Sequence, residues 1–414
     1  MIEGKTKVVR KFEAYGENCV LLKSKDRITA GDGARANDME GKGALSNMTN
    51  AAIYEFLNAS GIKTHFVKSV SDTEFVAQNC AMIPLEVVSR RLITGSYLKR
   101  NPGVKEGFRF PEPKLEYFFK DDANHDPQWS REQILEADMT FAGLRIGRHE
   151  LDEITTSAQA IFEILEKAWA SRGVVLVDMK IEFGVNLKTK EILLADVIDN
   201  DSWRVWPAGD KRLMRDKQVY RNLKEVTSEA IAEIKKNYAW VAEQVKMFSS
   251  KPTSRVVILM GSPSDMEHCK KIKSKLELCG VPTEMRVTSA HKGTEETMRI
   301  LHYYESHGIP TVFIAVAGRS NGLGPVLSGN TCYPVINCPP IKADWGNQDI
   351  WSSLRLPSGL GCTTVTDPDG AALAAAQIAA MNDHVVWCKL RGQRLSNAVK
   401  LMQADKALLN SVSI

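Results

Sequence analysis

From residue 255 onward the chain alternates between short apolar runs and longer amphipathic stretches. The apolar runs are RVVILM, PTEMRVTS and TVFIAVAG, and they are separated by DMEHCKKIKSKLELCG and EETMRILHYYESHG. Strands buried on both faces of a parallel sheet are continuously apolar, and amphipathic helices form the crossovers between them. This part of the chain is therefore predicted to be an α/β domain with a doubly wound parallel sheet. Two terminal helical stretches, 371–382 and about 386–410, are expected to cap it or to dock on a second subunit.

The preceding residues follow another pattern, with short apolar runs that are broken by glycine and charge. Examples are ENCVLLKSKD, THFVKSVSDTEFVAQNC and MIPLEVVSRR, which are typical of antiparallel strands. Helical spacing of apolar residues predicts helices at 44–60, 157–170 and 227–248. The sequence thus predicts an α+β domain with antiparallel sheets over 1–248. A small, polar, proline-containing linker follows at 249–254, and the parallel-sheet domain occupies 255–414.

Composition excludes several classes of protein. The 54 Lys and Arg residues nearly balance 50 Asp and Glu residues, so no concentrated positive field for nucleic acid is expected. No apolar run is long enough to span a bilayer, and the N-terminus is charged where a signal peptide would be apolar. The eight cysteines include no CxxC pair, which argues against zinc and disulfide frameworks. A reduced, cytosolic protein that binds small anions is expected.

The segment VLVDMKIEFGV carries three charged residues on one face of a predicted strand. Because side chains alternate along a strand, Asp178, Lys180 and Glu182 share that face. If NLKTK forms the turn, pairing centred on residue 189 places Asp196 of the next strand close to Glu182. Two carboxylates beside a phosphate-binding element are a usual arrangement for Mg²⁺. The alternative is an ordinary charged outer face of a hairpin.

Other charged segments of the first domain suit anions. Glu3-Gly4-Lys5-Thr6-Lys7 combines a glycine turn with two lysines and could lie over ATP phosphates, although it matches no standard phosphate-loop pattern. A second cluster, suited to phosphate or carboxylate, contains Arg90, Arg91, Thr94, Gly95 and Ser96. DNDSWR (199–204) and DKQVYR (216–221) add acids, a hydroxyl and bases. Each segment taken alone is also compatible with a solvated surface.

Three loops of the second domain follow predicted strands directly. They are Gly261-Ser262-Pro263-Ser264-Asp265, then SAHKG (289–293), then AGRSNGLGP (317–325). The carboxyl ends of parallel strands meet at one edge of the sheet, where ligands bind, and a helix N-terminus there favours phosphate. The alternative for the first loop is a simple helix cap by Ser264 or Asp265. The alternative for His291 is a structural histidine.

The first domain resembles the SAICAR synthetase (phosphoribosylaminoimidazole-succinocarboxamide synthase) family. The motifs are EGKTK at 3–7, IPLEVVSRRLITGS at 83–96, FFKDDANHDP at 118–127, VDMKIEFG at 177–184 and ADVIDNDSWR at 195–204. The resemblance implies an ATP-dependent C–N ligase that activates carboxyaminoimidazole ribotide (CAIR) as an acyl phosphate and joins it to L-aspartate. The family usually has a tyrosine and a strand before Glu-Gly-Lys, so either the start is truncated here or the first strand is very short.

The resemblance also implies roles for individual residues. Contacts to ATP phosphates are implied for Lys5, Lys7 and Lys120. Ligation of Mg²⁺ is implied for Glu182 and Asp196. Catalytic contact at the reacting carboxylate is implied for Lys180, with Asp178 positioning it. Binding of CAIR and aspartate is implied for Arg90, Ser96, Asp201, Ser202, Arg204, Lys217 and Arg221.

The second domain resembles the aminoimidazole ribotide (AIR) carboxylase family, through the three strand-end loops and LPSGLG (356–361). The loops are similar to the animal-type enzyme, a lyase that carboxylates AIR with CO₂ directly. A flavodoxin-like fold without biotin or metal is therefore implied. Catalysis is implied for His291, as the proton shuttle, and for Lys292. Binding of AIR and CO₂ is implied for Ser262, Ser264, Asp265, Ser289, Gly318, Arg319, Ser320 and Gly322.

Together the two resemblances match the fused carboxylase–synthetase enzymes of animal purine biosynthesis, in which the product of one domain is the substrate of the other. Family membership implies a homo-octamer assembled through the carboxylase domains, with no nucleic-acid or membrane partner. Three alternatives remain open from the sequence. The second domain could be an inactive oligomerisation module, or it could be a mutase that needs a carbamate substrate. The whole chain could also be a ribotide-binding regulator without turnover.

Overall fold

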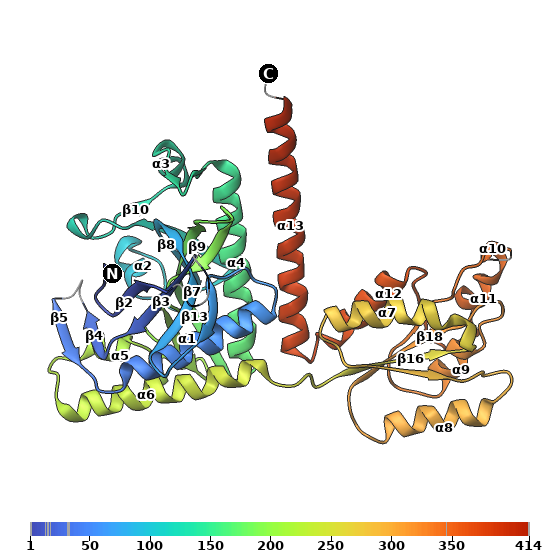
Figure 1. Cartoon of the computed structure of the whole chain (residues 1–414). Helices are drawn as coiled ribbons and strands as arrows, with labels where there is room; N and C mark the ends of the chain where they lie inside the picture. The colour runs from blue at the N-terminus through green and yellow to red at the C-terminus, as the bar shows by residue number, and fades with distance from the viewer. Residues whose placement is uncertain are drawn as a thin grey trace. The chain divides into compact units, whose positions relative to one another are not determined.

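The computed structural model describes residues 2–12, 14, 16, 18–30, 34–344 and 346–412 (Figure 1). The chain divides into two compact units. Unit 1 contains the residues up to Ser249 together with those from Arg391 onward, and unit 2 is Ser250–Leu390. The first crossing between the units therefore falls inside the segment 249–254. By this division, the C-terminal residues group with unit 1.

Unit 1 is built on two antiparallel sheets. The first has the strand order β1 (Ile2–Glu3), β2 (Lys7–Lys11), β3 (Cys19–Ser24), β7 (Glu74–Gln78) and β6 (Phe66–Ser69). The second has the order β10 (Gln128–Trp129), β9 (Arg109–Phe119), β8 (Cys80–Leu92), β13 (Val174–Asn186) and β14 (Ile192–Ala195), and β15 (Trp203–Pro207) also pairs with β13. Two short hairpins are β4 (Arg27–Ala30) with β5 (Arg35–Asp38) and β11 (Thr140–Phe141) with β12 (Leu144–Arg145).

The helices of unit 1 cover these sheets. They are α1 (Lys42–Ala59), α2 (Ser96–Arg100), α3 (Arg131–Glu136), α4 (Arg148–Ala170), α5 (Gln218–Asn222) and α6 (Ser228–Lys246). α1 and α6 contact one another along their lengths, and α4 packs against β13. α4 begins nine residues before the predicted start at 157, because Glu150 caps the polar first turn by accepting from the Gly147 backbone N–H (3.0 Å).

Unit 2 contains one parallel sheet of five strands. Its order is β17 (Thr283–Val287), β16 (Arg255–Met260), β18 (Thr311–Val316), β19 (Val335–Asn337) and β20 (Thr363–Thr364). In order of appearance along the chain this is 2-1-3-4-5, the doubly wound flavodoxin-like order, and the direction of winding reverses between β16 and β18. The loops that follow these two strands therefore border the crevice at which such sheets bind ligands.

Helices cover both faces of this sheet. They are α7 (Met266–Leu278), α8 (Thr294–Glu305), α9 (Leu323–Gly329), α10 (Gly346–Asp349), α11 (Trp351–Leu354) and α12 (Pro368–Ala379), followed by α13 (His384–Val412), which continues beyond unit 2. Alternate residues of β16 enter two different cores: Val256 and Ile258 pack with α7 and α12, and Val257 and Leu259 pack with α8 and α9. The predicted fold class, an α+β domain with antiparallel sheets followed by a doubly wound parallel-sheet domain, is confirmed.

Two further expectations concern the environment of the chain. All eight cysteines are free thiols. Within the described residues, no helix has the combination of length and apolar character that a bilayer crossing needs.

Candidate active sites

The charged face of β13 is buried in the middle of the second sheet of unit 1. By register Asp178 lies opposite Arg90 of β8, and Glu182 lies opposite Glu86. Lys180 lies between them and donates from Nζ to Glu86 Oε1 (2.6 Å) and to Glu182 Oε1 (2.8 Å). The side chains of Asp178 and Glu182 are only 6% and 3% exposed. Because buried charges are costly unless they are paired, this is not an ordinary solvated hairpin face.

The pairing of β13 with β14 differs by one residue from the prediction. Glu182 lies opposite Ala195, not opposite Asp196. The turn 187–190 has an even number of residues, so the centre of the hairpin falls between Lys188 and Thr189, whereas the prediction centred it on residue 189. Asp196 follows the end of β14 and has a left-handed backbone conformation (φ 64°). A non-glycine residue adopts this conformation rarely, and mostly where neighbouring structure enforces it.

Three lysines surround the two predicted metal ligands. Lys120 Nζ donates to Glu182 Oε2 (2.9 Å), and Lys7 forms an ion pair with Asp196. Burial lowers the pKa of Lys7 to about 8, and Glu182 opposes this effect while Lys120 and Lys180 add to it. The charges of Lys7, Lys120, Lys180, Glu182 and Asp196 therefore form one electrostatic group. Both carboxylates act on the Lys7 ammonium.

The donor set of this group fits Mg²⁺ bound together with a nucleotide. Among the described residues, no three His, Cys, Asp or Glu side chains gather as a metal site. Mg²⁺ in nucleotide enzymes typically uses only one or two carboxylates, because phosphate oxygens and water complete its coordination. Glu182 and Asp196 are two such carboxylates, and the ammonium groups of Lys7 and Lys120 lie beside them.

The Glu-Gly-Lys turn between β1 and β2 borders a cleft of about 450 Å³. The residues that line the cleft are Glu3, Gly4, Lys5, Lys25, Arg27 and Thr29. Lys25, which the sequence analysis did not select, donates from Nζ to Gly4 O (3.0 Å) and thereby holds the turn. The exposed Lys5 reaches Asp122 Oδ1 (3.2 Å) in the FFKDDANHDP motif. Two of the motifs that define the family resemblance are thus in contact.

The predicted arginines converge on one carboxylate. Asp178 Oδ2 accepts from Arg90 Nη1 (2.8 Å) and also pairs with Arg204. Arg90 Nη2 lies 3.3 Å from Ser96 Oγ. Gly95, with φ 58°, leaves space for the Arg204 guanidinium, because a Cβ at this position would lie 2.7 Å from Nη2. Residues from three separate motifs therefore form one cationic cluster. Asp178 orients Arg90 and Arg204, and the expectation that it positions Lys180 is wrong.

Two members of this cluster were missed by the sequence analysis. Glu116 of β9 is buried and pairs with Arg90, and its Oε1 accepts from Arg100 Nη2 (2.6 Å). Arg91 faces the other way and forms a two-point contact with Glu166 at 2.7 Å. The prediction that Arg91 belongs to one cluster with Arg90 is therefore wrong, because adjacent residues of a strand point to opposite faces. The sequence also does not reveal that Glu116 lies beside Arg90.

Of the residues predicted in 199–204 and 216–221, some meet across the two segments and one bonds only within its own loop. Asp201 Oδ2 accepts from Lys217 Nζ (3.1 Å), so these two motifs meet. The Ser202 hydroxyl is used within its own loop, where it donates to Val197 O (3.2 Å). Arg221 is exposed. Burial and then Asp201 raise the pKa of Tyr238, and the charge of Arg221 partly opposes this rise, so Arg221 lies near Asp201 and Tyr238.

In unit 2 the three strand-end loops meet at the carboxyl edge of the sheet. Gly261 donates its backbone N–H to Val316 O (2.8 Å), and a Cβ at Gly261 would lie 3.4 Å from Ala317 Cβ. The loops after β16 and β18 are therefore in contact. The loop after β17 joins them through His291, because a Cβ at Gly322 would lie only 2.6 Å from Nε2 of this exposed histidine.

The first of these loops keeps its polar groups near the edge of the sheet. Ser262 Oγ accepts from the Ser264 backbone N–H (3.2 Å) and from Ser264 Oγ (2.9 Å). Asp265 occupies the N-cap position of α7 but makes no capping bond with its side chain, although the residue is only 6% exposed. The alternative, a helix cap by Ser264 or Asp265, is therefore not what the structure shows: Ser262 caps the short turn before α7, and Asp265 makes no capping bond.

The second and third loops present mainly backbone and exposed polar side chains. Ser289 Oγ accepts from the Lys292 backbone N–H (3.3 Å), and the Lys292 side chain is exposed. Arg319 has φ 58°, and both it and Ser320 are exposed. Gly318 lies against Pro340, which follows β19. A non-glycine residue with positive φ is strained, and such residues concentrate at functional sites.

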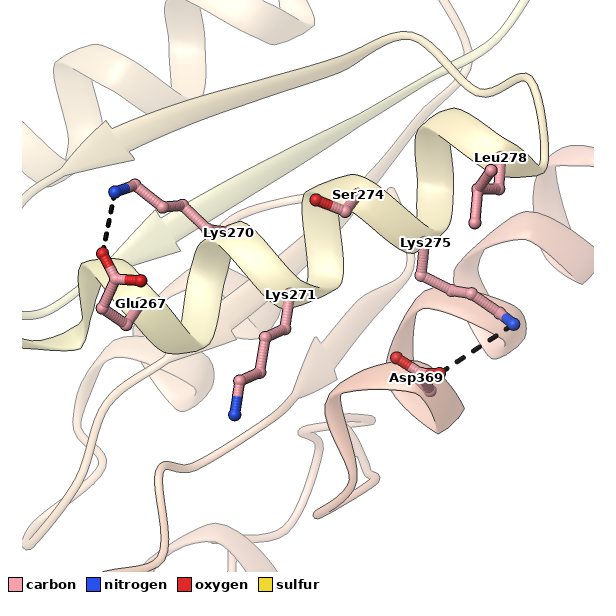
Figure 2. Close-up of a pocket in the computed structure, with 7 residues that line it drawn as sticks. All are labelled: Glu267, Lys270, Lys271, Ser274, Lys275, Leu278 and Asp369. Atoms are coloured by element: carbon pink, nitrogen blue, oxygen red, sulfur yellow. Dashed lines mark hydrogen bonds and ion pairs between the residues drawn. The ribbon is translucent and has the colours of Figure 1, made fainter.

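A shallow groove of about 380 Å³ lies between α7 and α12 (Figure 2). Its lining residues are Glu267, Lys270, Lys271, Ser274, Lys275, Leu278 and Asp369. Lys270 pairs with Glu267 within α7, and Lys275 lies 3.9 Å from Asp369. None of the predicted site residues lines this groove.

Comparison with known proteins tests the two resemblances. The SAICAR synthetase family model matches residues 1–237, and the AIR carboxylase family model matches residues 255–400. The bifunctional phosphoribosylaminoimidazole carboxylase/phosphoribosylaminoimidazole succinocarboxamide synthetase of Rattus norvegicus is 59% identical over 410 residues, which cover 99% of this chain and 96% of the relative. The chain belongs to this bifunctional family. The Drosophila melanogaster relative with the same name is 55% identical and covers 99% of this chain and 95% of its own length.

Solved structures match unit 1 of the bifunctional carboxylase–synthetase. The phosphoribosylaminoimidazole-succinocarboxamide synthase of Ehrlichia chaffeensis is 30% identical, with a TM-score of 0.52, over 59% of this chain and 97% of that structure. A SAICAR synthetase (Type-2) solved in complex with ADP is 34% identical, with a TM-score of 0.50, over 58% and 97%. The predicted family and the predicted bifunctional carboxylase and synthetase function are confirmed by these comparisons.

The contact between Gly322 and His291 gives a first testable prediction for the carboxylase–synthetase. Gly322→Ala fits the local backbone (φ −77°), but its Cβ would displace the imidazole. Because an error of about 1 Å in a reacting group costs roughly 10²-fold, we expect kcat/KM for AIR carboxylation to fall about 10- to 100-fold. Steady-state CAIR formation measures the effect. SAICAR synthesis from added CAIR is the internal control, and an unchanged carboxylation rate would contradict the prediction.

Proposed function

We propose that the two units catalyse consecutive steps, with the synthetase in 1–248, a linker at 249–254 and the carboxylase in 255–414. The carboxylase converts AIR and CO₂ into CAIR, and the synthetase joins CAIR to L-aspartate with ATP to give SAICAR, ADP and phosphate. Contacts between motifs that are far apart in the sequence carry this proposal. His291 meets Gly322 in unit 2, and Asp178 joins Arg90 to Arg204 in unit 1.

In the proposed carboxylation, a ring carbon of AIR attacks CO₂, a C–C bond forms, and the proton of that carbon leaves. His291 is exposed at the meeting point of the loops and takes this proton, a task that suits an imidazole near neutral pH. Lys292 and the loop at Gly318 and Gly322 hold CO₂ and the new carboxylate. The ribotide is bound by Ser262, Ser264, Asp265, Ser289, Arg319 and Ser320.

In the proposed ligation, a CAIR carboxylate oxygen attacks the γ-phosphorus of ATP and ADP leaves. The aspartate amine then attacks the acyl phosphate, and phosphate leaves as the amide forms. Lys5, Lys7 and Lys120 neutralise the phosphates, and Lys180 lies beside the reacting carboxylate. Arg90, Ser96 and Arg204 bind CAIR, while Asp201, Ser202, Lys217 and Arg221 serve the aspartate side. Alignment and charge neutralisation supply the catalysis, without a covalent nucleophile.

Mg²⁺ is proposed to bind at Glu182 and Asp196. When bound, the ion would neutralise charge on the ATP phosphates. The lysines that now pair with these carboxylates would then be released toward the phosphates, since Lys7 and Lys120 are already adjacent. No biotin is proposed, and no metal is proposed for the carboxylase.

We also propose a cytosolic homo-octamer that assembles through the carboxylase. Free thiols throughout the chain suit a reducing compartment. Unit 2 exposes large apolar side chains that an assembly would cover: Leu278, Tyr303, Ile341, Trp351, Leu354 and Met381. Light scattering coupled to size-exclusion chromatography measures the assembly, and a monomer at micromolar concentration would contradict it.

The reaction sequence is tested with the purified chain, AIR and bicarbonate, first without ATP. CAIR should form, which would exclude both the inactive-module alternative and the mutase alternative, because a mutase needs a carbamate made beforehand. Adding ATP, Mg²⁺ and L-aspartate should then give SAICAR with one ADP per product. Absence of CAIR in the first stage would overturn the proposed carboxylase. Absence of aspartate-dependent ADP release in the second stage would favour a ribotide-binding regulator.

A further inference from the structure

A deeply buried lysine lies behind the proposed aspartate side of the synthetase. Lys42 begins α1, and its side chain is 2% exposed. Its Nζ lies 3.3 Å from Asp201 Oδ2 and 5.9 Å from the ring centroid of Tyr238. Burial acts to lower the pKa of Lys42, but Asp201 and then Asp199 more than compensate, so its pKa is raised. The side chain is therefore a fixed buried cation.

Asp201 connects this cation to the site. Its Oδ2 accepts from both Lys42 and Lys217, and its Oδ1 accepts from the Tyr238 hydroxyl. Burial acts to raise the pKa of Asp201, but Lys42 and then Lys217 overcome it and the pKa is lowered. These three hydrogen bonds hold the carboxylate of Asp201 in one orientation. We call Lys42, Asp201, Lys217 and Tyr238 the Asp201 cluster.

Exposure separates the members of the cluster by role. The Lys42 side chain is 2% exposed and that of Lys217 is 11% exposed, whereas Arg221 beside them is exposed. Arg221 can therefore meet a ligand directly, Lys217 reaches the surface only with a small part of its side chain, and Lys42 has no access to a ligand. Because Lys42 also pairs with Asp201, the charge of Lys217 is only partly offset by this carboxylate and can act on a ligand. Lys42 also offsets the neighbouring carboxylate Asp199, so without Lys42 Asp201 would draw on Lys217 as its remaining described ammonium partner.

We propose that Lys42 is a positioning residue for the aspartate substrate: it neutralises Asp201 from below, so that Lys217, with Arg221, can bind the two carboxylates of L-aspartate. The inference rests on the proposed synthetase function and deepens it. Charge-assisted bonds between an ammonium or guanidinium and a carboxylate are strong and directional, so two outward cations suit a dianionic amino acid.

Lys42→Met tests the proposal, measured as separate KM values in the full-length protein. Lys42→Met removes the charge and keeps the length of the side chain. We expect the KM for aspartate to rise by about tenfold or more, which is the cost of one weakened charge-assisted bond, while the KM for ATP and CAIR changes less than about threefold. Succinate, which lacks the amine, should lose affinity as an inhibitor to the same extent, because it probes carboxylate binding alone.

Two further variants keep the test decisive. Lys42→Met with Asp201→Asn removes both charges, so it should fold even if the single variant does not. Because Asp201 then no longer neutralises Lys217, this double variant should return the aspartate KM toward the wild-type value. Lys63→Met, an exposed lysine that pairs with Glu191, is the matched control and should leave all three KM values unchanged. An unchanged aspartate KM in a folded Lys42→Met single variant would overturn the inference, as would an equal rise in all three KM values or a double variant whose aspartate KM stays tenfold or more above that of the wild type. A wild-type protein without aspartate-dependent ADP release would instead overturn the proposed function on which the inference rests.

Discussion

Replacing His291 by asparagine is expected to lower the rate of AIR carboxylation about 10²- to 10⁴-fold, the usual contribution of a general acid or base. Asparagine retains a polar side chain of similar reach but does not accept a proton from the ring carbon of AIR. The imidazole is exposed and lies against the loop at Gly322, so its removal should leave the fold of unit 2 intact. CAIR formation from AIR and bicarbonate measures the loss.

The bifunctional chain supplies the control for this variant. SAICAR synthesis from added CAIR should proceed at the wild-type rate, because unit 1 is untouched. His302→Asn, at an exposed histidine on α8, is the matched control within unit 2 and should carboxylate AIR normally. A His291→Asn protein that retains a tenth or more of its carboxylase rate would refute the role of proton acceptor.

Replacing Glu182 by glutamine is expected to lower SAICAR synthesis about 10²- to 10³-fold while carboxylation is retained. The substitution keeps the volume of the side chain and removes the negative charge that Lys120 and Lys180 share. A neutral amide would bind Mg²⁺ poorly and would leave three lysines with one fewer counter-charge. The Mg²⁺ concentration needed for half-maximal ADP release should therefore rise together with the loss of rate.

Glu191→Gln is the matched control for this second prediction. Glu191 belongs to the same hairpin, but it is partly exposed and pairs with Lys63 at the surface. Its replacement should change neither activity, because exposed ion pairs contribute little to stability. Normal SAICAR synthesis at wild-type Mg²⁺ concentration in Glu182→Gln would exclude this carboxylate from metal binding.

The sequence predicted the site residues best where a periodic rule applies. Alternation along β13 placed Asp178, Lys180 and Glu182 on one face, and strand ends placed His291 beside the glycine-rich loop. Both rules depend only on local geometry, which the order of residues determines. The hairpin register was predicted with an error of one residue. The sequence does not show at which residues the strands end and the turn begins, so the centre of the hairpin was misplaced.

Residues that act through distant partners were not predicted. Lys42 and Glu116 are ordinary charged residues in their local sequence, and a charged residue is usually solvated. Their importance arises only when α1 approaches the loop at Asp201 and when β9 pairs with β8. The separation of Lys42 from Asp201 is 159 positions, so no local pattern indicates the contact.

The even-numbered turn between β13 and β14 has a consequence for how relatives of this chain can vary. The turn is largely exposed, and only the spacing that it imposes matters for the carboxylates on either side. One inserted or deleted residue would rotate every side chain of β14 to the opposite face and swing Asp196 away from Lys7. Natural homologues should therefore vary freely at 187–189 but preserve the length of this segment as strictly as they preserve catalytic groups, and at Lys190 they should favour residues that accept its left-handed backbone (φ 62°).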